Sequence, residues 1–177
     1  MRKTLLAVCR VITIIQVLLM TLMLVVMNAL VLTRYLFDYS APWTEEVTCY
    51  SMVWMVMLGA GVLTLFNDHI GWYMLVESLS PPVRYWQRLF AQTLAFSVGV
   101  IVTWTGFNFA LSMRSVEAPA LQINQMGPAL AVPIGAVLIT LFSGLRIALL
   151  IAEKVGGKKI ELVSQAEFMD SSFKPAK

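Results

Sequence analysis

Three charged side chains gather in a short polar stretch between two long apolar segments of the chain. Arg34 follows the first segment, and the adjacent glutamates Glu45 and Glu46 begin the second, just after Trp43. Charged groups are costly to take out of water, so those at the edge of a membrane segment suggest a function. Carboxylates at a helix start also complement its dipole and cap free amides. This pattern favours a helix cap, an ion pair between Arg34 and a glutamate, or a docking surface for another protein, with Trp43 as an interfacial anchor.

Residues for other kinds of chemistry are missing from the sequence. His69 is the only histidine, and one histidine cannot build a zinc site or a bis-histidine haem site. Cys9 and Cys49 are predicted near opposite membrane faces, whereas a disulfide needs Cα atoms within about 7 Å. No acidic residue falls in the middle of an apolar segment, where a proton or cation site would need one. We therefore expect no enzyme activity, no metal and no cofactor in this chain.

The composition predicts a membrane protein. The chain is 59% hydrophobic and 13% charged, whereas soluble domains are about 25% charged. Four apolar stretches can cross a hydrocarbon core of about 30 Å, at about residues 11–33, 45–66, 89–113 and 129–152. We predict an all-α integral membrane protein of four tilted transmembrane helices in a domain of residues 1–156, followed by a polar tail at 157–177. The net charge of +3 is too small and scattered for nucleic acid binding.

Basic residues predict the orientation, because cytoplasmic loops carry an excess of Lys and Arg. The two tails and the second loop contain Arg2, Lys3, Arg10, Arg84, Arg88, Lys154, Lys158, Lys159, Lys174 and Lys177. The other two loops contain only Arg34 and Arg114, so both termini are predicted to be cytoplasmic.

The second loop also contains an amphipathic segment. Trp72, Leu75, Val76 and Leu79 have the i, i+3, i+4, i+7 spacing of one helical face. The segment is too short to span a bilayer. We therefore predict an interfacial helix at about residues 70–79, lying on the cytoplasmic face of the membrane.

Small residues suggest how the spans pack. Ala136, Thr140, Gly144 and Ala148 recur at every fourth position of the fourth span, and Gly59 and Gly61 lie near the middle of the second. Such small-residue stripes let helices approach closely in lipid, although a lipid-facing helix could carry them by chance. Arg146 lies in the fourth span, and we expect it to snorkel to the cytoplasmic face, with a buried partner on another subunit as the alternative.

The sequence resembles the small, DctQ-like membrane subunit of tripartite ATP-independent periplasmic (TRAP) transporters. The similarity covers about residues 11–152 and is most specific over 34–69. It rests on Arg34 after the first span, the Trp43-x-Glu45-Glu46 start of the second, Gly59, the Asn67-Asp68-His69 turn, and the four-span layout.

The resemblance implies a three-part importer in the bacterial inner membrane. A periplasmic binding protein would capture an organic acid such as a C4-dicarboxylate or a sialic acid. A separate large membrane subunit would hold the substrate and use the sodium gradient as an elevator, and the small subunit would be a fixed scaffold beside it. We expect Arg34, Trp43, Glu45 and Glu46 to help dock the binding protein, and the small residues of spans two and four to pack against the large subunit.

Two rival classes fit less well. A stand-alone four-helix transporter of the small multidrug type needs an acidic residue inside the first helix, and this chain has none there. A four-span thiol oxidoreductase needs paired cysteines, which are also missing. The multidrug-type transporter remains the alternative.

Overall fold

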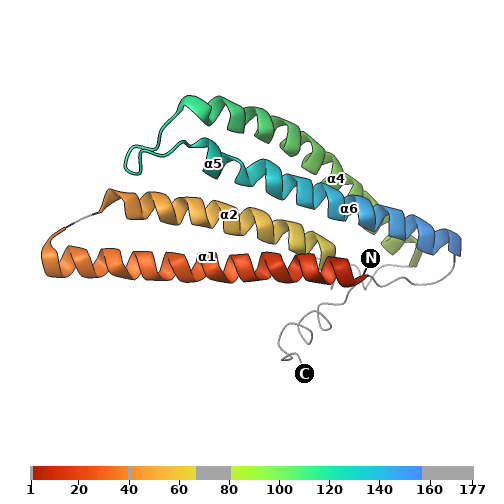
Figure 1. Ribbon diagram of the computed structural model, residues 1–177. Helices are drawn as coiled ribbons and strands as arrows, with labels where there is room; N and C mark the ends of the chain where they lie inside the picture. The colour runs from red at the N-terminus through yellow and green to blue at the C-terminus, as the bar shows by residue number, and fades with distance from the viewer. Residues whose placement is uncertain (1, 40, 67–80, 157–177) are drawn as a thin grey trace, which may run out of the picture.

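A computed structural model describes residues 2–39, 41–66 and 81–156, and helices dominate these ranges. The long helices are α1 (Arg2–Phe37), α2 (Pro42–Phe66), α4 (Pro81–Ser112) and α6 (Ala131–Gly156). The short helices η1 (Met113–Ser115) and α5 (Met126–Ala129) lie between α4 and α6 (Figure 1). Four helical segments are long and apolar enough to cross a membrane, and α5 continues into α6 to form the fourth. This confirms the predicted all-helical, four-span fold.

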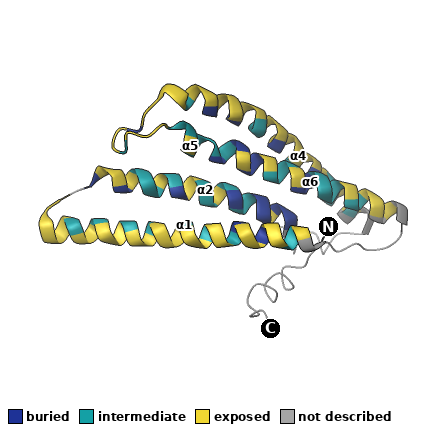
Figure 2. Ribbon diagram, in the orientation of Figure 1, coloured by how far each residue is buried: buried dark blue, intermediate teal, exposed yellow. Residues whose placement is uncertain are grey.

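The long helices are arranged side by side in the order α1, α2, α6, α4 (Figure 1). The main contacts are between α1 and α2, between α2 and α6, and between α6 and α4. The last long helix of the described residues, α6, therefore lies between two earlier ones. The helices α1 and α4 form the edges of this row, and much of their surface is exposed (Figure 2).

A heptad pattern explains why α1 and α2 pair. The less exposed positions of α1 include Cys9, Ile12, Gln16, Leu19, Met23, Val26 and Leu30, which alternate in steps of three and four. Along α2, Thr44, Thr48, Ser51, Met55, Leu58, Val62 and Leu65 show the same alternation. Such spacing keeps one stripe of each helix facing the other over many turns, as in a coiled coil. The two helices thus form a long antiparallel hairpin.

The apolar core lies at the end of the row that contains the start of α1. Its buried members are Cys9, Ile12, Leu58, Val62, Leu65 and Phe142. Toward the other end the α1–α2 pair and the α4–α6 pair diverge (Figure 1). We call that other end the loop end, because it contains the α1–α2 connection at 38–41 and the loop at 116–125.

Two helices extend well beyond the predicted spans. The helix α1 begins at Arg2, and α4 runs without a break for 32 residues from Pro81. The predicted interfacial helix with Trp72, Leu75, Val76 and Leu79, the turn with His69 and the tail at 157–177 lie outside the described residues. These features and the membrane side of each terminus stay predictions.

Candidate functional site

The predicted docking residues lie together at the loop end. Arg34 is in the last turn of α1 and exposed, and the Trp43 side chain is 44% exposed in the first turn of α2. The helix α2 begins at Pro42, a residue suited to the first helical position because its missing N–H has no helical partner there. The buried Thr44 donates its hydroxyl to the carbonyl of Ala41 at 2.6 Å, which fixes this start.

Glu46 bonds to a loop 74 residues later in the chain. Its Oε1 accepts the backbone N–H of Ala120, and its Oε2 accepts that of Leu121, each at 2.9 Å. Hydrogen bonds to an ionised carboxylate are stronger than those between neutral groups. Glu46 therefore clamps α2 to the loop that joins α4 to α5.

The ion pair between Arg34 and a glutamate, one of the alternatives that the sequence left open, is not formed in the described part of the chain. Within the described ranges no salt bridge joins Arg34 to Glu45 or Glu46. Both carboxylate oxygens of Glu46 are engaged by the loop, and the side chain of Glu45 is exposed. The prediction that Arg34 meets a protein partner is not tested by a single chain.

The loop at residues 116–125 is a compact hairpin. Ala118 donates to the carbonyl of Ile123 at 2.8 Å, and Gln122 donates to the carbonyl of Ala118 at 2.9 Å. An isolated β-bridge joins Glu117 and Asn124. Gln122 has a positive φ of 53°, which turns the chain back toward α5. The hairpin lies between the two membrane-spanning segments Tyr85–Ser115 and Met126–Ala152.

Gly59 makes room for a polar contact between α1 and α2. The side-chain amide of Gln16 donates to the carbonyl of Met55 at 3.1 Å. A Cβ on Gly59 would lie 2.6 Å from the Gln16 Nε2 atom. The missing side chain thus lets Gln16 reach a helix carbonyl, and hydrogen bonds of this kind hold helices together in lipid.

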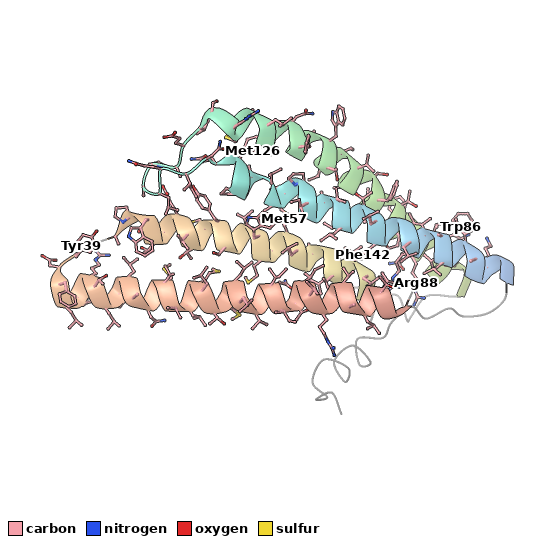
Figure 3. All side chains as sticks on the ribbon, viewed as in Figure 1. Tyr39, Met57, Trp86, Arg88, Met126 and Phe142 are labelled. Atoms are coloured by element: carbon pink, nitrogen blue, oxygen red, sulfur yellow. The ribbon has the colours of Figure 1, made fainter. Side chains whose placement is uncertain are left out.

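The contact between α2 and α6 also depends on glycine. A Cβ on Gly61 would lie 2.7 Å from the Cβ of Leu138. A Cβ on Gly135 would lie 2.7 Å from the Cβ and 2.8 Å from the carbonyl oxygen of Met57, which is in α2 on the side of α6 (Figure 3). The backbones therefore approach too closely here for any side chain.

The stripe predicted on the fourth span faces α4 of the same chain. A Cβ on Gly99 would lie 2.4 Å from the Thr140 hydroxyl oxygen, and one on Gly144 would lie 3.3 Å from the Phe96 ring. Ala136 is 2% exposed, whereas Ala148 is exposed. The sequence correctly indicated close packing, but most of this stripe packs inside the chain. A contact with a second subunit is not tested by one chain.

Sequence reasoning missed the glycines that complete these contacts. Gly99 and Gly106 face α6 from α4, and Gly135 faces α2 from α6. The spacing of seven between Gly99 and Gly106 was a readable signal, since it repeats the same helix face.

Arg146 bonds to α2 of its own chain, and its expected snorkelling to the cytoplasmic face stays a prediction. Its Nε atom donates to the carbonyl of Leu65 at 3.0 Å, and its Nη2 atom donates to the same oxygen. The last carbonyls of a helix lack intrahelical donors, and Leu65 is in the last turn of α2. The guanidinium therefore caps α2 and ties it to α6.

The far ends of α4 and α6 are joined by a cation–π contact. The Lys154 ammonium lies 4.7 Å from the Tyr85 ring centroid and 5.3 Å from that of Trp86. The two rings are edge-to-face, with centroids 6.1 Å apart.

Toward the loop end an apolar groove of about 640 Å³ lies between α4 and α6, lined by residues that include Val100, Trp104, Phe107, Pro133 and Val137.

Comparison with known families decides the identity. Across the described residues no three His, Cys, Asp or Glu side chains meet as a metal site requires, and the site consists of packing contacts and a clamped loop. The model of one family, described as "Tripartite ATP-independent periplasmic transporters, DctQ component", matches residues 22–153. The chain belongs to the DctQ family. A search among curated proteins found no match.

The family match confirms the resemblance and gives this DctQ chain a coarse function. It is a small membrane component of a TRAP transporter. The family is one of transporter components and not of enzymes. Because the transporter is tripartite, a large membrane subunit and a binding protein are implied as partners. The match gives no support to the multidrug-type alternative.

Proposed function

We propose that this chain is the fixed scaffold subunit of a TRAP transporter and helps the periplasmic binding protein to dock. The observation that carries the proposal is the DctQ match over residues 22–153 of a four-span helical chain. In this proposal the transporter takes up an organic acid, such as a C4-dicarboxylate or a sialic acid, with a sodium gradient that the large subunit uses. The chain lies in the bacterial inner membrane with both termini cytoplasmic.

The packing of the chain supports a scaffold role. Transport paths are marked by broken helices with charged or polar groups near the bilayer midplane. Here α1, α2 and α4 are each continuous, and every acidic residue of the sequence lies at or beyond the ends of the spans. Most of the small residues that allow close approach are used between the chain's own helices. The exposed apolar faces of α1 and α4 then remain for lipid and for the large subunit.

Co-purification tests the scaffold proposal. The tagged chain would be extracted from its native membrane in a mild detergent, and the proteins that accompany it would be identified and quantified. A large membrane protein in a fixed stoichiometric ratio is expected, while an unrelated membrane protein with the same tag should not retain it. A chain that purifies alone as a homo-oligomer and transports in liposomes would instead support the multidrug-type alternative.

Reconstitution tests the transport proposal. Uptake of labelled organic acids into proteoliposomes should require this chain, the large subunit, the binding protein and an inward sodium gradient. A potassium gradient of the same size is the control. Uptake that persists without this chain would contradict the proposed role.

A further inference from the structure

The 116–125 hairpin is exposed and yet fixed at many points. Besides its internal turn, Gln125 donates to the carbonyl of Val116 at 3.0 Å, and the Asn124 side chain bonds the backbones of Arg114 and Met126. Ala118 is 1% exposed, so the base of the turn is buried. The Ile123 side chain, by contrast, is 45% exposed, and Glu117, Gln122 and Asn124 are exposed beside it.

Glu46 fixes where this hairpin lies. The amides of Ala120 and Leu121 are at its tip, where water could serve as their acceptor, so a protein acceptor is not needed to satisfy them. What the carboxylate adds is position, because two bonds from one side chain on α2 set both the distance and the orientation of the tip. Ordering an exposed loop costs conformational entropy. Because Glu46 already orders the hairpin in the free protein, this entropy is not lost again when a partner binds, and the binding is tighter.

We propose that the 116–125 hairpin is a docking element for the soluble binding protein, with Glu46 as its positioning residue. This rests on the proposed function and changes the role predicted for Glu46, which acts through the hairpin. Contact with the partner is made by Ile123 and the polar side chains beside it. The partner surface that fits them is polar with a small apolar patch.

The position of the hairpin favours a soluble partner over lipid. The hairpin begins after the membrane-spanning segment that ends at Ser115 and finishes before the one that begins at Met126. It exposes Glu117, Gln122 and Asn124, which do not suit the hydrocarbon core. Arg34 lies in the last turn of α1 and Glu45 in the first turn of α2. These helix ends are at the same end of the molecule as the hairpin (Figure 1).

Two measurements on the membrane complex in nanodiscs test the proposal. Hydrogen exchange at residues 118–123 reports whether the clamp holds, and binding of the purified soluble component of the same transporter reports docking. For Glu46→Ala we expect faster exchange at Ala120 and Leu121 and binding weakened by roughly tenfold. Thr93→Ala is the control: it removes an exposed hydroxyl that donates to the Leu89 carbonyl of its own helix, α4, well away from the loop end. Both measurements should stay at the wild-type value for this variant.

A second variant separates docking from folding. Ile123→Ser leaves the clamp intact, so exchange should match the wild type while binding weakens. If the Glu46→Ala chain does not assemble into the complex, the Ile123→Ser variant alone tests the docking role of the hairpin. A loosened hairpin with unchanged binding, an unchanged hairpin in Glu46→Ala, or wild-type binding by Ile123→Ser would each overturn the proposal.

The remaining outcomes point to other partners. Loss of the large membrane subunit from the Ile123→Ser complex would show that the hairpin contacts that subunit, and would overturn docking of the soluble component.

If the wild-type complex itself does not form, or never binds the soluble component, the proposed function is wrong, and the docking role of the hairpin is wrong with it. Failure limited to the variants leaves the proposed function standing.

Discussion

At the residue scale, several side chains and glycines contact backbone atoms of a neighbouring helix or loop. Glu46 accepts two loop amides, Arg146 donates to the Leu65 carbonyl, and Gln16 donates to the Met55 carbonyl. Gly135 lies directly against the Met57 backbone. The sequence showed that Arg34, Glu45, Glu46 and Arg146 were unusual, but it could not show their partners. A backbone amide or carbonyl is present at every residue and leaves no mark in the sequence.

Gly135 gives a sharp test of this close packing. Gly135→Ala places a methyl group 2.7 Å from the Met57 Cβ and 2.8 Å from its carbonyl oxygen, and the backbone cannot move aside easily. We expect a loss of about 1–3 kcal/mol in the free energy of unfolding, measured as thermal or denaturant unfolding of the purified chain in detergent. Gly127→Ala is the control, because nothing lies within 4 Å of a Cβ there. Equal stability of the two variants would contradict the close contact.

Arg146 can be tested by keeping its charge. Arg146→Lys retains the charge but loses the planar fork that places two donors on the Leu65 carbonyl. We expect Arg146→Met to lose about 1.5–3 kcal/mol and Arg146→Lys to recover only part of that loss in the same unfolding assay. A lysine variant as stable as the wild type would instead fit a snorkelling side chain.

At the element scale, much of the structure could be predicted. Hydrophobic length alone located four spans. The heptad spacing of α1 from Cys9 to Leu30 was readable too, since a repeat of 3.5 residues is characteristic of paired helices. The choice of partner was not readable, because small residues such as Gly144 suit any neighbouring helix in lipid. That is why the stripe on α6 was assigned to another subunit although most of it packs on α4.

The contact between the ends of α4 and α6 can be measured by a double-mutant cycle. Lys154→Gln and Tyr85→Leu each remove one side of the cation–π pair, which lies 4.7 Å from ammonium to ring centroid. We expect a coupling free energy of about 0.5–1 kcal/mol between the two changes in the unfolding assay. A coupling indistinguishable from zero would mean that the two side chains do not act as a pair.

At the scale of the whole molecule, the loop end carries the residues through which the chain is proposed to meet its soluble partner. Arg34 is exposed there and has no ion pair with Glu45 or Glu46 in the described part of the chain. Its guanidinium is thus available to a surface carboxylate of another protein. Hydropathy could predict the two loops at this end, because it located the spans that they connect. The clamped hairpin could not be predicted, because it depends on a contact between residues 74 positions apart.

Reversal of the charge at Arg34 tests this surface. Arg34→Glu should lower uptake by about fivefold or more, because a like charge placed against a carboxylate weakens docking. Uptake would be measured in proteoliposomes at several concentrations of the binding protein, and the half-saturating concentration should rise. The yield of complex with the large subunit is the control and should not change. Loss of that complex would show instead that Arg34 is needed for assembly.

The order of the helices has a consequence for synthesis in the cell. Among the long helices of the described residues, α6 is the last to be synthesised, and it must enter between α2 and α4. Until then Gly61 on α2 and Gly99 on α4 have no neighbour to cover their exposed backbones. A ribosome that stalls before Ala131 therefore leaves the α1–α2 pair and α4 in the bilayer without the helix that packs between them, and insertion of α6 becomes the event that completes the bundle.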